Sequence, residues 1–169
     1  RSMEKAPFNT GPDSLWIAFL ASAEMDCFIQ LGWPLPDNVL DIFVEFRNLT
    51  NGRTLPHGAS LLGAMAYYGL ASIAPAEKVA MRDLILSRGP WSEKQESEIL
   101  DYCQSDVDAL AQLFFKMEPL IDWPRALLRG HYMKAVSQIQ ACGIPMDVAL
   151  LEETQKYWDK IREQLIDKI

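Results

Sequence analysis

Apolar positions along the chain recur at two spacings, and the spacing predicts the type of each element. Continuous apolar runs at residues 15–20 and 39–43 have the length and composition of buried parallel strands, although the first run also permits the start of a helix. Apolar residues at steps of three and four predict helices over residues 23–31, 44–49, 60–68 and 75–88. Because two strands are too few for a stable sheet of their own, we expect an α/β fold that is predominantly helical.

The longest predicted helix lies in the middle of the chain. It begins at Ser92, where Gln95 three residues later completes a capping box, and it extends to about Met117. An apolar stripe covers one face of this helix, and Tyr102 and Asp106 share another face, one turn apart. A phenol beside a carboxylate can hold a metal ion and orient a metal-bound water. The alternative interpretation is an ordinary amphipathic helix with solvated acids.

Two further helices are predicted after the central one. The first extends from the Asp-Trp-Pro cap at residue 122 to about Ala141, and Asp147 caps the last helix. The apolar stripe of that last helix requires a partner surface and consists of Leu151, Trp158, Ile161, Leu165 and Ile169. We therefore expect a flexible lead-in over residues 1–13, a compact domain over 14–121 and a helical extension over 122–169.

Composition and charge restrict the classes of partner. The chain of 169 residues has a net charge of -7, so a nucleic acid must be held locally or through metal ions. Its 3 cysteines are far apart in the sequence, which is typical of a reducing compartment and predicts a cytoplasmic protein without a zinc site. Because no apolar run reaches the length of a membrane span, no membrane partner is expected.

Acidic residues occur where both strand candidates end. Glu24 and Asp26 follow the first candidate, and Asp41 lies near the end of the second. The carboxyl ends of parallel strands meet at one edge of a sheet, where these acids would face Asp106 of the central helix. Two magnesium ions about 4 Å apart require several carboxylate oxygens, so this arrangement suits a two-metal phosphoryl-transfer site.

The order of these motifs resembles the DEDD exonucleases, and more closely the 3′–5′ proofreading domain of family A DNA polymerases. Residues 98–107, which contain Tyr102 and Asp106, are similar to the third motif of that family. Residues 129–136 and 142–147 look like the chain entering a polymerase thumb. The match covers residues 14–169. The resemblance implies a truncated ribonuclease-H-like fold with a residual parallel sheet, followed by thumb-like helices.

The resemblance also implies roles for single residues. Tyr102 would orient or help to deprotonate a metal-bound water, and Asp106 would be a ligand of the metal on the nucleophile side. Asp26 aligns with the carboxylate of the second motif, and Glu24 is the local alternative. Asp41 aligns with an acid near a strand end, with helix capping as its alternative role. The implied cofactor is Mg²⁺ or Mn²⁺, the implied substrate is the 3′ end of single-stranded DNA, and the expected nucleic-acid contacts are Arg47, Arg53 and Arg129.

One motif of the family is missing. The Asp-x-Glu that bridges both metals in that family does not occur upstream of the second strand candidate. The first hypothesis is therefore a fragment or split part of a polymerase-associated 3′–5′ exonuclease, weak or inactive alone, whose missing strands come from another chain or a homodimer. The second is a catalytically inactive DNA-binding or protein-assembly module. The third is a helical interaction protein for which the resemblance misleads.

Overall fold

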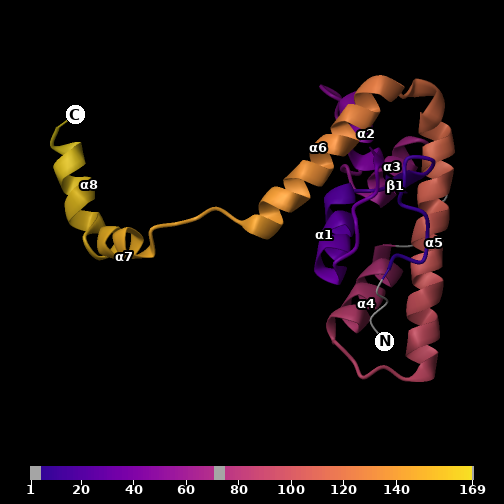
Figure 1. The fold of residues 1–169 in the computed structure, drawn as a ribbon, viewed down its shortest axis with the longest axis horizontal. Coiled ribbons are helices and arrows are strands. Elements are labelled where there is room, and N and C mark those ends of the chain that lie inside the picture. Colours follow the sequence, from indigo (N-terminus) through magenta and orange to yellow (C-terminus); the bar gives the residue numbers. More distant parts are fainter. Residues whose placement is uncertain (1–4, 71–74, 169) are drawn as a thin grey trace. The chain divides into compact units, whose positions relative to one another are not determined.

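The computed structural model describes residues 5–70 and 75–168, which form helices and a two-stranded parallel sheet (Figure 1). The fold is therefore α/β and predominantly helical, as expected. In chain order the elements are β1 (Leu15–Ala18), α1 (Ala21–Leu31), β2 (Asn38–Asp41), α2 (Ile42–Leu49), α3 (Leu61–Tyr67), α4 (Pro75–Leu86), α5 (Glu93–Met117), the 3₁₀ turn η1 (Glu118–Leu120), α6 (Trp123–Cys142), α7 (Val148–Lys156) and α8 (Trp158–Ile166).

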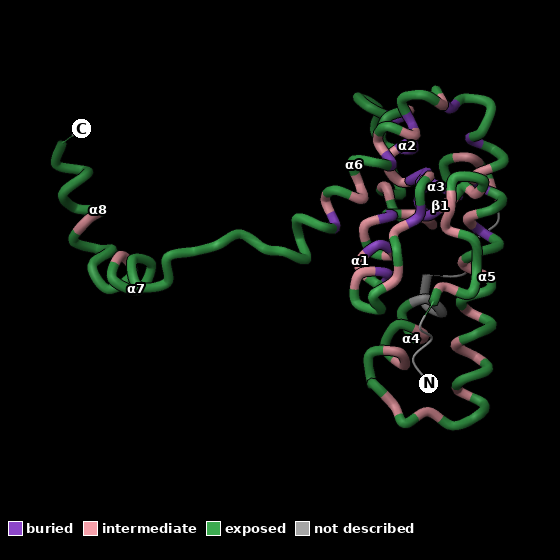
Figure 2. The backbone as a smooth tube through the Cα atoms, viewed as in Figure 1, coloured by how far each residue is buried: buried purple, intermediate pink, exposed green. Residues whose placement is uncertain are grey.

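The chain divides into two compact units, Arg1–Gln138 and Ile139–Ile169. The division falls within α6 and later than the expected boundary before residue 122, because the earlier turns of α6 bury Ala126, Gly130 and Ser137. The buried positions gather in the first unit, whereas α7 and α8 bury no residue (Figure 2).

The two strands have helices packed on both faces. Trp16 pairs in register with Val39, and Ile17 pairs with Leu40. Because side chains alternate across a strand, these two pairs point to opposite faces of the sheet. On one face Leu40 joins the core cluster formed with α2, α3 and α5, and Ile17 packs against it. On the other face Val39 and Trp16 pack with residues of α1.

Helix α6 crosses the outer edge of β2. Ala126 belongs to the core cluster on one face of the sheet, and Met133 packs against the cluster on the other face. Between them, Gly130 lies so close to β2 that a Cβ atom built on it would be 1.8 Å from the carbonyl oxygen of Val39. A helix with contacts on both faces and to the backbone in between must pass the strand edge, so α6 closes this side of the sheet.

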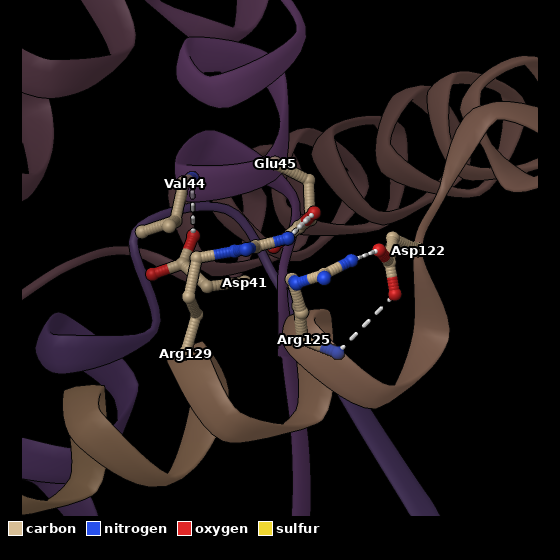
Figure 3. Close-up of polar contacts among 6 residues, drawn as sticks. All are labelled: Asp41, Val44, Glu45, Asp122, Arg125 and Arg129. Atoms are coloured by element: carbon tan, nitrogen blue, oxygen red, sulfur yellow. Dashed lines mark hydrogen bonds and ion pairs between the residues drawn. The ribbon is translucent and has the colours of Figure 1, made fainter.

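An ion pair joins the same helix to α2. Arg129 donates through Nε and Nη2 to the two carboxylate oxygens of Glu45, each at 2.6 Å (Figure 3). The Glu45 side chain is 2% exposed and the Arg129 side chain 26% exposed. Two parallel hydrogen bonds between a guanidinium and a carboxylate have both charge and geometry in their favour, so this pair fixes the orientation of α6 on the first unit.

The carboxylate of Asp41 organises the exits of both strands. One oxygen, Oδ1, accepts hydrogen bonds from the backbone N–H groups of Leu20, Phe43 and Val44 at 3.1, 3.0 and 3.3 Å. The other, Oδ2, accepts from the N–H of Ala21 at 2.8 Å. The first residues of α1 and α2 thus share one acceptor, and Figure 3 shows the contact with Val44. A single side chain provides acceptors for the N-termini of two helices.

Most predicted elements are present, and their ends show which local signals were decisive. The capping box of Ser92 and Gln95 starts α5 as predicted. The predicted strand over 39–43 ends two residues too late, because Asp41 caps a helix that begins at once with Ile42. The predicted last helix is divided at Tyr157 into α7 and α8. Ile169 of its expected stripe lies outside the described residues.

We expect the substitution Asp41→Ala to lower the free energy of unfolding by about 1–4 kcal/mol, because two helix N-termini lose their acceptor and each cap contributes about 0.5–2 kcal/mol. Urea denaturation followed by circular dichroism measures the change. The neighbouring Asp37→Ala is the control, since Asp37 is exposed. Equal stability of the two variants would contradict the capping role.

We expect Gly130→Ala to destabilise the first unit by at least about 3 kcal/mol, because the added methyl group meets a backbone carbonyl that has no room to move. Thermal unfolding measures the effect. Gln138→Ala, at an exposed position of the same helix, should change stability by no more than about 0.5 kcal/mol. An unchanged melting temperature in Gly130→Ala would show that α6 does not lie on the edge of β2.

Candidate metal centre

Two carboxylates from distant parts of the sequence line one cavity in the first unit. The cavity has a volume of about 300 Å³, and Glu24 of α1 and Asp106 of α5 contribute its acidic groups. Its remaining lining is apolar and consists of Phe19, Leu61, Val107 and Leu110. Apolar side chains next to the two acids lower the local dielectric constant, which strengthens their electrostatic interaction with a bound cation.

The position of Glu24 follows from the way in which α1 begins. Leu20 has a left-handed backbone conformation, with φ of 70°, and Ala21 is held by Asp41 Oδ2 at 2.8 Å. These two constraints set the helical phase from the first residue onward. Met25 and Phe28 then point into the core, and Glu24 in the first turn faces the cavity.

One oxygen of the Glu24 carboxylate is buried and, among the described residues, has no hydrogen-bond donor to balance the loss of water. Within the described part of the chain, its Oε2 is buried and has no hydrogen-bond partner. Burial raises the pKa of Glu24 above its usual range and the negative charge of Asp41 raises it further, whereas a backbone hydrogen bond opposes the shift. A buried carboxylate next to other acids is costly unless a cation or a donor approaches it.

Tyr102 and Asp106 interact as their spacing predicted. Burial raises the pKa of Tyr102 to about 12, and the negative charge of the neighbouring Asp106 contributes to this shift. The phenol is therefore neutral at any physiological pH. A phenol that holds its proton can donate a hydrogen bond to a nearby carboxylate or to a water molecule. The ring lies beside Ile85 and Leu86 of α4.

The structure does not bring Asp26 to this cavity. Asp26 follows Glu24 by two residues, which is about 200° around a helix, so the two side chains leave α1 on different faces. Glu24 lines the cavity and Asp26 is not among the lining residues. Glu24, which was the local alternative to Asp26, therefore shares the cavity with Asp106. Met25 lies between the two acids in the sequence and is buried, which agrees with a helical phase that turns Glu24 toward the cavity.

Asp41 has the capping role that was its alternative. It is 1% exposed, and four backbone N–H groups surround it. Burial raises the pKa of Asp41, and these four donors oppose the shift. Asp41 is not among the residues that line the cavity, so it acts on the site through its charge and by setting the start of α1.

The three arginines expected to contact nucleic acid are in different environments. Arg47 and Arg53 line a second, largely polar cavity of about 260 Å³ formed by the loop after α2. Arg53 also donates to the hydroxyl of Tyr67 at 2.8 Å. The guanidinium of Arg129 is instead held by Glu45, which engages two of its three nitrogens, Nε and Nη2. No local pattern predicts this ion pair, because Glu45 and Arg129 are 84 residues apart in the chain.

The acids of the cavity provide part of a metal site. Among residues 5–70 and 75–168, no group of three or more His, Cys, Asp and Glu side chains is arranged to hold a metal ion. Two carboxylates are enough for one magnesium ion that keeps several waters or binds substrate phosphates. A second ion requires ligands in addition to Glu24 and Asp106.

The chain matches no family model, no curated protein and no solved structure. In the described residues we find no helix with the length and apolar character needed to cross a bilayer.

We expect Glu24→Gln to raise the free energy of unfolding at neutral pH. An unfolded carboxyl group ionises near 4.5, and the folded protein releases the Glu24 proton at higher pH. The folded state therefore binds more protons in this window, so stability falls as the pH rises through it. Glutamine removes this loss, and the difference between variant and native chain should disappear below pH 4.5. Urea denaturation at a series of pH values tests this, with Asp26→Asn as the matched variant of an acid on the same helix but outside the cavity.

Proposed function

We propose that this chain supplies one part of the active site of a metal-dependent 3′–5′ exonuclease. The observation that carries the proposal is the shared cavity of Glu24 and Asp106, in which the carboxylate oxygen Oε2 of Glu24 is buried without a partner. The likeness of residues 98–107 to the third motif of proofreading exonucleases supports the same reaction.

The acids fit a magnesium or manganese ion by their chemistry. Hard divalent cations prefer carboxylate oxygens, and a buried carboxylate with a raised pKa gains most from a nearby positive charge. Glu24 and Asp106 would hold the ion. The ion supplies activation of a water molecule and stabilisation of a leaving oxygen.

The other residues of the site position these two acids. Tyr102 keeps its proton at neutral pH and lies beside Asp106, whose negative charge helps to raise the pKa of the phenol. Phe19 and Leu61 exclude water from the sides of the cavity. Arg47 and Arg53 provide a local positive site for the phosphates of a DNA strand, in a protein whose net charge of -7 otherwise repels them. The proposed substrate is the 3′ end of single-stranded DNA.

A partner is part of the proposal. A two-metal site requires more carboxylate oxygens than Glu24 and Asp106 offer, so the remaining ligands come from a segment outside the described residues. Alone, the chain should bind a metal weakly and hydrolyse DNA slowly.

A binding or assembly module is the second candidate. It is favoured by the large apolar side chains that unit Ile139–Ile169 exposes, of which Ile144 is 84% and Met146 65% exposed. Such surfaces are typical of protein contacts. This candidate requires no metal, so metal binding distinguishes it from the nuclease.

We expect Mn²⁺ to broaden the NMR signals of residues around the cavity. Glu24→Gln and Asp106→Asn should each weaken Mn²⁺ binding on the order of tenfold or more, because each removes one ligand charge. Asp26→Asn is the matched control, since it removes an acid two residues from Glu24 but outside the cavity. If all variants bind Mn²⁺ equally, or if Asp26→Asn is the variant that loses binding, the proposed site is wrong.

The same variants test the reaction with 3′-labelled single-stranded DNA and Mn²⁺. The native chain and Asp26→Asn should release labelled nucleotides slowly, and Asp106→Asn should release none. If the native chain binds Mn²⁺ but releases no nucleotide, the exonuclease assignment for the chain alone is overturned. The chain would then be a metal-binding module.

A further inference from the structure

One edge of the sheet is open. In the described part of the chain β1 pairs with β2 and with no other strand. The far edge of β2 is closed by α6 at Gly130. A strand edge presents backbone N–H and C=O groups that can pair with a further strand. The outer edge of β1 is therefore the side on which this sheet can grow.

An apolar cavity lies beside β1, against α5. It has a volume of about 280 Å³, and its lining consists of Ile17, Val107, Leu110, Ala111, Phe114 and Phe115. Val107 is 59% exposed and Phe115 67% exposed, and Leu100 continues the same apolar face of α5 at 68% exposure. An apolar surface of this extent next to an open strand edge is not expected to remain in water.

On the other face of β1, the indole N–H of Trp16 requires a hydrogen-bond acceptor. Its indole Nε1 is buried, and no hydrogen-bond acceptor for it lies among residues 5–70 and 75–168. An unpaired buried donor is unfavourable, so an acceptor brought to this strand from outside is favoured.

We propose that the outer edge of β1 and the apolar face of α5 together bind an extended strand of another polypeptide segment. Its backbone pairs with β1, and its alternate side chains, which are apolar, fill the cavity next to Ile17. An extended backbone is the occupant that satisfies a strand edge and places a side chain over the adjoining helix at every second residue.

A second copy of this chain fits the surface less well. The β1 strand of a second copy would have to fill the cavity with the side chain of Ile17, which already packs in the core of its own molecule. Two copies also carry a net charge of -7 each and repel one another. The occupant that we infer is therefore a strand with free apolar side chains.

The proposed strand is a candidate for the partner that the proposed metal site requires, so this inference rests on the proposed function. The cavity under β1 shares Val107 and Leu110 with the cavity of Glu24 and Asp106. A strand bound at this edge passes next to the two carboxylates, where further ligands are required.

The test joins a strand of alternating valine and threonine to the N-terminus of the full chain through a flexible Gly-Ser linker, which raises its local concentration. Hydrogen exchange at the amides of Leu15–Ala18 should slow by about tenfold or more relative to the unfused chain. A fusion with proline at alternate positions is the control, because proline cannot donate to a strand ladder.

Two charge substitutions locate the contact. Phe115→Glu should abolish the protection, since it places a charge on the proposed surface. Leu128→Glu, at an equally exposed apolar position of α6, should preserve it, as Phe115 and Leu128 are 67% and 68% exposed. Circular dichroism of the unfused variants establishes that both fold.

Two results would overturn the inference. One is equal exchange at β1 in the valine–threonine and proline fusions. The other is an unfused chain that sediments as a dimer with β1 already protected, which would assign the surface to a second copy. Exchange reports strand binding and Mn²⁺ broadening reports the acids, so a failure of this inference is distinguishable from a failure of the proposed metal site.

Discussion

The architecture of the first unit depends on one carboxylate, that of Asp41. It ends β2, caps α2, and also accepts hydrogen bonds from the first residues of α1. Because the two strands leave the sheet side by side, one acceptor reaches both helix starts. The helical phase of α1, and with it the direction of Glu24, follows from this arrangement. A structural residue thus determines the geometry of the candidate site without lining it.

Three acids with buried oxygen atoms show how differently the protein treats negative charge. Glu45 is paired with Arg129 through two hydrogen bonds, and Asp41 is surrounded by four backbone donors. Glu24 has an oxygen with neither kind of compensation in the described chain, and it shares its cavity with Asp106. Stability is served by the first two arrangements and opposed by the third. A fold that keeps such an acid in place retains a site where a positively charged ligand is favoured.

Local signals in the sequence were sufficient for some of these features. The capping box fixes the start of α5, and a spacing of four residues brings Tyr102 to Asp106. The choice between Glu24 and Asp26 depended on the phase of α1, which is set by a contact with Asp41 some twenty residues later in the chain. The interaction between Glu45 and Arg129 is more distant still, so a pattern of single residues could not reveal it. Sequence reasoning placed an acid of the segment after β1 beside Asp106, but it could not choose between Glu24 and Asp26 or find the partner of Arg129.

The closure of one sheet edge by α6 has a consequence for how this protein assembles. Sheets that are open at both ends can add molecules without limit and form fibres, whereas a sheet with one accessible end accepts a neighbour once. Gly130 permits the close approach of α6 to β2 that creates this asymmetry. A side chain at this position would push α6 away from β2 and expose the outer edge of β2 as a second unpaired strand edge. The absence of a side chain at Gly130 thus leaves one edge of the sheet, rather than two, available to a further strand.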